Sequence, residues 1–153
     1  MQEPEKFMKQ ALKEAQKAYE KLEVPVGAVI VKDGKIIARA HNEKEEKKDT
    51  TKHAEITAIQ KASKKLQAWR LQDCDMYVTL EPCSMCAGAL IQARVRKIYI
   101  GALDEKTGAC GSVLNLLQDY PFNHKVEIQS GVLEEEAKQI LQDFFKKLRE
   151  QKK

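Results

Sequence analysis

Three potential metal-binding side chains that lie far apart along this sequence restrict the folds that it can adopt. Cys83 and Cys86 are separated by two residues, and His53 lies well upstream of both. Cys83 follows a proline, and an apolar run typical of a helix follows Cys86. The two thiols are therefore expected one turn apart at a helix N-terminus, on the same face. Because His53 begins a second stretch with helical spacing, the sequence predicts two helix N-termini that face each other.

This combination of residue types predicts a catalytic zinc site. The positive end of a helix lowers the pKa of a thiol, which favours the thiolate that binds metal. One imidazole and two thiolates leave the fourth position of zinc open for water, whereas structural sites are usually closed by four protein ligands. Glu55 follows His53 by two residues and is expected to move protons rather than bind metal. His-x-Glu followed by Pro-Cys-x-x-Cys is the signature of zinc deaminases that act on nucleobases.

Two other interpretations of the signature stay open. The first is a zinc deaminase of small molecules, such as free cytosine, guanine or a nucleoside. The second is a non-enzymatic RNA-binding module in which Cys74, Cys110 or His124 supplies a fourth zinc ligand and Glu55 has no chemical role. A chain of 153 residues is long enough to fold on its own hydrophobic core, which argues against a module that needs a metal to fold.

The composition indicates one globular domain, which we expect to span residues 1–153. With 42% hydrophobic and 33% charged residues, extensive disorder is not expected. No apolar run approaches the roughly 20 residues of a membrane span, and the N-terminus has no apolar signal core. We therefore expect a cytoplasmic protein without membrane contact. The net charge of +4 is compatible with a nucleic-acid partner but does not demonstrate one.

Apolar periodicity predicts helices and strands that alternate along the chain. The predicted helices cover residues 7–22, 53–67, 84–93, 113–118 and 134–149, and the predicted strands cover residues 26–31, 35–41, 74–80, 97–102 and 125–130. Asp33-Gly34 predicts a hairpin turn. Residues 43–52 are predicted to be a charged, flexible connection. This order indicates an α/β domain whose sheet is covered by helices on both faces.

Further blocks of the sequence carry a family resemblance that covers nearly the whole chain. They are Glu23-Val24-Pro25-Val26-Gly27-Ala28, Asn42, the run from Tyr77 to Cys83, Gly101-Ala102, Lys106-Thr107-Gly108-Ala109, Asn123-His124 and Asp143-Phe144-Phe145. With the zinc signature, they resemble the cytidine-deaminase-like superfamily and, within it, the bacterial tRNA-specific adenosine deaminases. Two departures from the family pattern are Thr50-Thr51-Lys52 before His53 and Ser84 between the cysteines. Neither departure removes a ligand or Glu55.

The resemblance implies a three-layer α/β/α cytidine-deaminase-like fold with a five-stranded mixed sheet in the order 2-1-3-4-5. It also implies a homodimer with one Zn²⁺ per subunit and no nucleotide cofactor. The implied reaction is hydrolytic deamination of adenosine to inosine at the wobble position (34) of an arginine tRNA, with release of ammonia. The implied partner is the tRNA anticodon stem-loop. In this reaction His53, Cys83 and Cys86 hold the zinc, and Glu55 moves the protons.

The resemblance also implies residues that contact the substrate. Asn42 would hydrogen-bond the base, although it is equally suited to capping a turn. Val26 and Leu80 would form pocket walls, and plain core packing is the alternative for both. Contacts to the anticodon loop, with a plain surface role as the alternative in each case, are implied for Asp104, Lys106, Asn123, His124, Phe145 and Arg149. An aromatic side chain among basic residues suits the stacking of splayed RNA bases.

Overall fold

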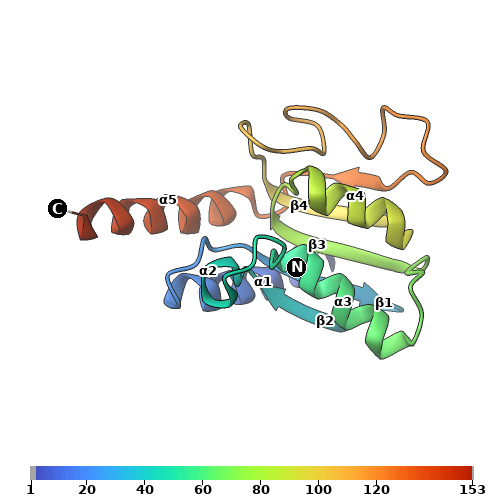
Figure 1. The fold of residues 1–153 in the computed structure, drawn as a ribbon, viewed down its shortest axis with the longest axis horizontal. Coiled ribbons are helices and arrows are strands. Elements are labelled where there is room, and N and C mark those ends of the chain that lie inside the picture. The colour runs from blue at the N-terminus through green and yellow to red at the C-terminus, as the bar shows by residue number, and fades with distance from the viewer. Residues whose placement is uncertain (1–2, 153) are drawn as a thin grey trace.

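The computed structural model of the chain describes residues 3–152, in which a five-stranded sheet lies between two layers of helices (Figure 1). The strands are β1 (Gly27–Lys32), β2 (Lys35–His41), β3 (Cys74–Leu80), β4 (Lys97–Ala102) and β5 (Glu127–Gln129). The helices are α1 (Glu3–Glu20), α2 (Lys44–Lys47), α3 (Ala54–Leu66), α4 (Ser84–Ala93) and α5 (Glu134–Gln151).

The sheet has the predicted order, β2-β1-β3-β4-β5. Strand β1 pairs antiparallel with both β2 and β3, and β3, β4 and β5 run parallel. The hairpin between β1 and β2 turns at Asp33 and Gly34, whose φ angles are 51° and 74°. Two positive φ angles are what the tight hairpin turn requires, and Asp-Gly is favoured there for that reason. The three-layer cytidine-deaminase-like architecture is therefore confirmed.

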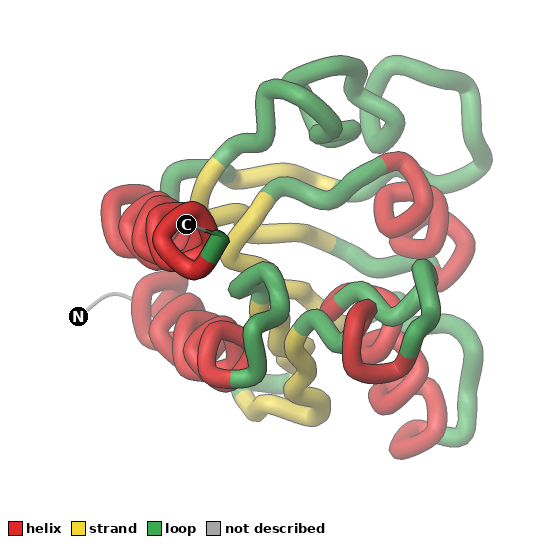
Figure 2. The backbone as a smooth tube through the Cα atoms, turned by 60° about the vertical axis from the view of Figure 1, so that its left-hand side comes forward, coloured by secondary structure: helices red, strands yellow, loops and turns green. Residues whose placement is uncertain are grey.

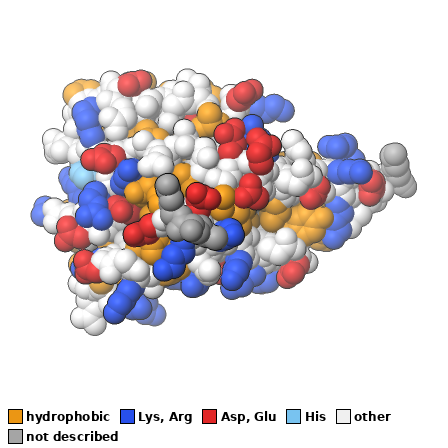
Figure 3. All heavy atoms as spheres, turned by 180° about the vertical axis from the view of Figure 1, so that it is seen from behind, with side chains coloured by type: hydrophobic (Ala, Val, Ile, Leu, Met, Phe, Trp, Pro, Cys, Tyr) orange, Lys and Arg blue, Asp and Glu red, His pale blue; other side chains and the backbone are white. Residues whose placement is uncertain are grey.

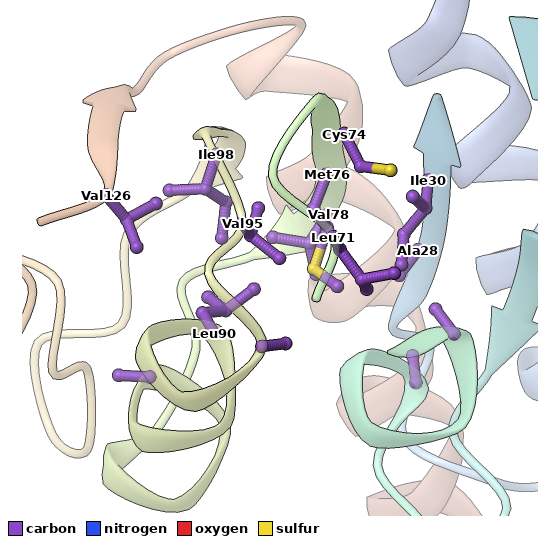
Figure 4. Close-up of a cluster of buried hydrophobic side chains, with 14 of the residues drawn as sticks. Ala28, Ile30, Leu71, Cys74, Met76, Val78, Leu90, Val95, Ile98 and Val126 are labelled. Carbon is purple, nitrogen blue, oxygen red and sulfur yellow. The ribbon is translucent and has the colours of Figure 1, made fainter. Parts of the chain in front are cut away.

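Each face of the sheet packs against its own pair of helices, α3 and α4 on one side and α1 and α5 on the other (Figure 2). On the α3–α4 side, buried side chains of the strands, such as Ile30, Met76 and Ile98, belong to one hydrophobic cluster with Leu90 of α4 (Figure 4). The smaller core on the other side joins α1 to the sheet through Phe7, Met8, Ala11, Val29, Val31, Tyr77 and Val132. The two cores fix the ends of the helices relative to the strands.

Helix α1 approaches β1 so closely that residue 27 has no room for a side chain. A Cβ atom on Gly27 would lie 2.0 Å from the carbonyl oxygen of Ala11 and 2.4 Å from the backbone nitrogen of Ala15. Both contacts are with helix backbone, which cannot move aside as a flexible side chain would. The glycine in the Val-Gly-Ala segment thus sets the distance between α1 and the sheet.

The substitution Gly27→Ala is therefore expected to lower the free energy of unfolding by about 3 kcal/mol, because α1 must shift off the sheet. Urea denaturation followed by circular dichroism measures this change. An unchanged midpoint with an unchanged m-value would contradict the close approach of α1 and β1.

Two segments differ from the sequence-based expectation. Residues 44–47 form the short helix α2, where a flexible connection was predicted. Residues 113–118 form a bend, an isolated β-bridge from Asn115 to Cys110 and a turn, and not the predicted helix. The N–H groups of Val113 and Leu116 donate to the carbonyl oxygens of Gly108 and Ala109 at 2.9 and 2.8 Å. These bonds run back to a neighbouring turn, so they are not available for a helical ladder.

The remaining differences concern element ends. Helix α1 ends at Glu20, before the predicted residue 22, because Leu22 adopts a positive φ of 62°. Strand β5 is limited to Glu127–Gln129.

The C-terminal part of α5 projects beyond the sheet (Figure 1), and Phe144 is buried whereas Phe145 is 43% exposed. Across residues 3–152, no helix is both long enough and apolar enough to cross a membrane.

Candidate active site

Two helix N-termini carry the three potential metal ligands, as the sequence predicts. His53 is the N-cap residue of α3, and Cys83 is the N-cap residue of α4. Neither residue makes a side-chain capping hydrogen bond to its helix, and the two side chains face each other. Cys86 lies in the first turn of α4 and is fully buried. Strand β3 ends at Leu80, directly before the segment that carries both cysteines, and so fixes where α4 begins.

The three side chains converge on one point. The Nδ1 atom of His53 lies 3.7 Å from Sγ of Cys83 and 3.5 Å from Sγ of Cys86. All three ligand atoms lie within 4.8 Å of one another, which forms a group that could hold a metal ion. Among residues 3–152, this cluster contains no fourth histidine, cysteine or carboxylate ligand. The arrangement is the one expected for an open rather than a closed metal site.

The candidate fourth ligands are engaged elsewhere. Nε2 of His124 lies 2.7 Å from the carbonyl oxygen of Val95 and donates its proton there. Cys110 is buried with its Sγ 4.0 Å from the carbonyl oxygen of Pro82. Cys74 is buried in β3. The structure therefore gives no support to a zinc module closed by one of these residues.

Hydrogen bonds within the cluster shift the pKa values of the two thiols in opposite directions. The Cys86 thiol and the His53 imidazole both hydrogen-bond Cys83, and these bonds lower the pKa of Cys83 to about 3. The pKa of Cys86 is raised, because its proton is held in the bond to Cys83 and because it is buried. The bond to Cys83 also raises the pKa of His53. The hydrogen bonds of the cluster therefore favour the thiolate form of Cys83, which is the form that binds metal.

Glu55 lies beside the cluster in the first turn of α3. Its side chain is buried, and burial raises its pKa to about 7 against the opposing effect of the His53 charge. It also hydrogen-bonds Cys86. A carboxyl group in this position can accept a proton from, or donate one to, a molecule bound at the cluster.

A pocket opens over the cluster and brings together several of the predicted substrate residues. Its lining includes His53, Glu55 and Cys83 of the cluster region together with four of the predicted substrate residues, Asn42, Val26, Leu80 and Asp104. The side-chain amide of Asn42 also caps the local turn, since Nδ2 donates to the carbonyl oxygen of Val24 and Oδ1 accepts from the N–H of Lys44. Both roles considered for Asn42 are therefore compatible with its position.

The other predicted RNA contacts lie outside this pocket. Exposed positions are found for Lys106, Asn123 and Arg149, and for the aromatic ring of Phe145. His124 is half-buried and hydrogen-bonded to Val95. Lys44 and Thr107 also line the pocket, although the sequence does not predict them as site residues. Their residue types give no functional signal, and each lies in a segment positioned by distant contacts.

The fold and the site together define a hydrolytic deaminase of the cytidine-deaminase-like class. The sheet is mixed, and two facing helix N-termini present His53, Glu55 and two cysteines. Comparison with known proteins narrows this class. The family model of the MafB19-like deaminases matches residues 2–149. The tRNA-specific adenosine deaminase of Bacillus subtilis is 53% identical over 153 residues, which cover 100% of this chain and 95% of the relative. That of Aquifex aeolicus is 52% identical, with 95% of both chains covered.

A solved structure from a study of A-to-I editing by tRNA:A34 deaminases has a TM-score of 0.86 and 46% identity, and covers 89% of this chain and 99% of its own. The chain therefore belongs to the MafB19-like deaminase family, among the tRNA-specific adenosine deaminases. It is an enzyme that acts on a C–N bond.

Proposed function

We propose that this enzyme deaminates adenosine to inosine at the wobble position (34) of an arginine tRNA anticodon and releases ammonia. The observation that carries the proposal is the convergence of His53, Cys83 and Cys86 beside the buried Glu55, at a pocket that His53, Cys83 and Glu55 line. The names of relatives that share about half of its residues over their whole length support tRNA as the substrate. The arginine identity rests on the family resemblance.

The donor set fits one Zn²⁺ per subunit. With Zn–S bonds of about 2.3 Å and Zn–N bonds of about 2.0 Å, a tetrahedral angle places nitrogen and sulfur about 3.5 Å apart. The two distances from His53 to the cysteines, 3.7 and 3.5 Å, agree with this value. Two thiolates and an imidazole are also the ligand types that zinc prefers over magnesium or calcium. We therefore assign His53, Cys83 and Cys86 as zinc ligands.

Zinc, when bound, supplies a Lewis acid that makes water acidic enough to act as a nucleophile near neutral pH. In our proposal, Glu55 accepts the proton of the attacking water and delivers it to N1 of adenine. Attack at C6 then yields a tetrahedral carbon, from which Glu55 transfers the second proton of the water to the departing amine. Ammonia leaves and inosine remains. One carboxylate can perform both transfers because it is buried at the cluster and faces the pocket.

The pocket walls would orient the base. One N–H of the Asn42 amide and one lone pair of its oxygen stay available beside the bonds to Val24 and Lys44, so Asn42 can still hydrogen-bond the base edge. Val26 and Leu80 add apolar lining, which suits contact with the faces of a purine.

Residues around the pocket and on α5 would bind the anticodon loop. Asp104 lines the pocket, and Lys106 is exposed close to it in the chain. Phe145 and Arg149 are exposed on the projecting part of α5, where basic, acidic and hydrophobic side chains all reach the surface (Figure 3). An exposed aromatic ring suits the stacking of an RNA base, and a neighbouring basic side chain suits an ion pair with a phosphate. We keep Asn123 and His124 as further candidates, the latter through its ring face.

The wider setting follows from the resemblance. We propose that residues 1–153 act as a single deaminase domain without a nucleotide cofactor. We also propose that the enzyme works as a homodimer in the cytoplasm, where tRNA is modified.

A deamination assay with defined RNAs tests the function. The zinc-loaded protein is incubated with the anticodon stem-loop of an arginine tRNA that carries A34, and separately with free adenine, adenosine, guanine and cytosine. We expect inosine at position 34 of the hairpin and no turnover of the free bases or the nucleoside, as measured by nucleoside chromatography. A hairpin with guanosine at position 34 is the control, and hairpins with A34 in other anticodon contexts test the arginine identity. Turnover of a free base but not of the hairpin would reject the proposal.

A further inference from the structure

Four glutamates are buried in the described part of the chain, and two of them have no role in the chemistry above. Glu14 bonds Lys17 and His41, and Glu55 lies at the metal cluster. Glu23 and Glu81 are only 1% and 3% exposed. Within residues 3–152, neither forms an ion pair. A buried carboxylate without a cation needs several strong hydrogen bonds to offset its loss of hydration.

The hydrogen bonds of Glu81 all go to the loop that follows β4. Oε1 accepts from the backbone N–H of Asp104 at 3.0 Å and from the hydroxyl of Ser112. Oε2 accepts from the N–H groups of Cys110 and Ser112 at 3.0 and 3.1 Å. Four donors fill the four acceptor sites of a carboxylate. Glu81 therefore has no free lone pair with which to move a proton, although it borders the same pocket as Glu55.

This loop needs an anchor. Residues 103–126 contain no helix or named strand, and connections of that length are uncommon in compact proteins unless they are functional. Gly108 lies so close to the carboxylate that a Cβ atom there would be 2.3 Å from Cδ of Glu81. The part of the loop held in this way carries Asp104 and Thr107, which form one side of the pocket.

Glu23 makes the corresponding bonds to the segment that contains α2. Its Oε1 and Oε2 accept from the N–H groups of Glu45 and Glu46 at 2.9 and 2.6 Å. Helix α2 has no side-chain bond from its own N-cap residue and no buried residue. A helix of one turn is not stable by itself, so it depends on such external bonds. Its first residue, Lys44, also lines the pocket.

We infer that Glu23 and Glu81 are positioning residues, which hold two sides of the pocket mouth in the geometry that receives the substrate RNA. The α2 rim consists of residues 42–48 and the β4 rim of residues 104–112. Glu23 fixes the α2 rim and Glu81 fixes the β4 rim, each through bonds from backbone N–H groups. Because Glu81 is followed directly by Pro82 and Cys83, one short segment supplies both a metal ligand and the anchor of the β4 rim. The inference rests on the proposed function for what the mouth receives.

The substitutions Glu23→Gln and Glu81→Gln test this inference and serve as controls for each other. Each keeps the side-chain size but replaces one acceptor oxygen with an NH₂ group that faces N–H donors. Amide hydrogen exchange, followed by NMR, measures how well the backbone N–H groups of the two rims are held. The measurement needs neither RNA nor enzymatic activity. In Glu81→Gln we expect the amides of Asp104, Cys110 and Ser112 to exchange about 10-fold faster, with those of Glu45 and Glu46 unchanged. In Glu23→Gln we expect the reverse.

Kinetics with the A34 stem-loop supply the functional readout. Both variants are expected to raise KM by about 10-fold with kcat within about threefold of wild type and one zinc per chain, because the rims bind RNA and do not move protons. If Glu81→Gln does not fold, Ser112→Ala, which removes one of the four donors, is expected to raise KM by about threefold. Unchanged exchange at the named amides, or a loss of kcat with KM unchanged, would overturn the inference. A wild-type protein that does not deaminate the hairpin would instead reject the proposed function, and the exchange result would stand by itself.

Discussion

Glu55→Gln is expected to lower kcat by about 10³-fold or more while the protein keeps one zinc per chain. Glutamine preserves the size of the side chain and some of its hydrogen bonding, but it cannot accept and release the protons of the attacking water. Glu55 is buried and follows the proposed ligand His53 by two residues, so no bulk water replaces it efficiently.

Single-turnover deamination of the A34 stem-loop measures this effect, and metal analysis of the same sample measures the zinc. An exposed carboxylate on α1, Glu20, provides the control, since Glu20→Gln is expected to behave as wild type. If Glu55→Gln deaminated the hairpin at the wild-type rate, the assignment of the proton carrier would be wrong. If it lost zinc as well as activity, Glu55 would have to be counted among the ligands.

The substitution Cys86→Ala is expected to have the second large effect, on metal binding and activity together. Changes in residues that only support a ligand weaken metal affinity by about 10- to 100-fold, so the loss of a direct ligand is expected to exceed this range. Zinc content should fall close to zero after dialysis against a weak chelator, and deamination should fall below detection. The helices and sheet should remain, because the two hydrophobic cores do not depend on the metal.

Cys74→Ala is the matched control for the loss of a thiol. Cys74 is also buried, but it lies in β3 and outside the metal cluster. We expect this variant to keep its zinc and most of its activity, and to show only the loss of packing. Retention of zinc in Cys86→Ala, or its loss in Cys74→Ala, would contradict the ligand assignment.

Most of the fold could be predicted because local signals and tertiary structure agree in these segments. Strands β2, β3 and β4 and helix α4 begin and end at the predicted residues. Helix α3 begins after its N-cap residue, His53, and the Asp33-Gly34 turn has both of the positive φ angles expected of it. Each of these elements has a regular apolar period bounded by residues that favour caps or turns.

The segments that were predicted wrongly depend on distant contacts. The lysines and glutamates of helix α2 favour a helix, but a single turn is too short to be stable alone, and its N–H groups are held by the carboxylate of Glu23. The apolar spacing of residues 113–118 suggests a helix, but their backbone bonds go to residues 108 and 109. In each segment, the local sequence is compatible with a helix and with an irregular connection, and hydrogen bonds to other segments determine which of the two forms.

The candidate site also contains residues that the sequence predicts and residues whose positions depend on distant contacts. The convergence of His53, Glu55 and the two cysteines could be predicted because metal chemistry restricts residue type and spacing. Lys44 and Thr107 could not, since lysine and threonine at the surface are common and their approach to the pocket depends on Glu23 and Glu81. The sequence also gives no sign that these two glutamates are buried, because glutamate is usually exposed.

X-ray absorption at the zinc edge of the purified enzyme tests the central claim most directly, since it counts the atoms around the metal. We predict two sulfur neighbours near 2.3 Å, one imidazole nitrogen and one further light atom supplied by solvent. An added small ligand that binds zinc should replace this solvent atom. Three or four sulfur neighbours, or a second imidazole, would mean that protein side chains close the site. A closed site would leave Glu55 without a water to deprotonate and would contradict the account.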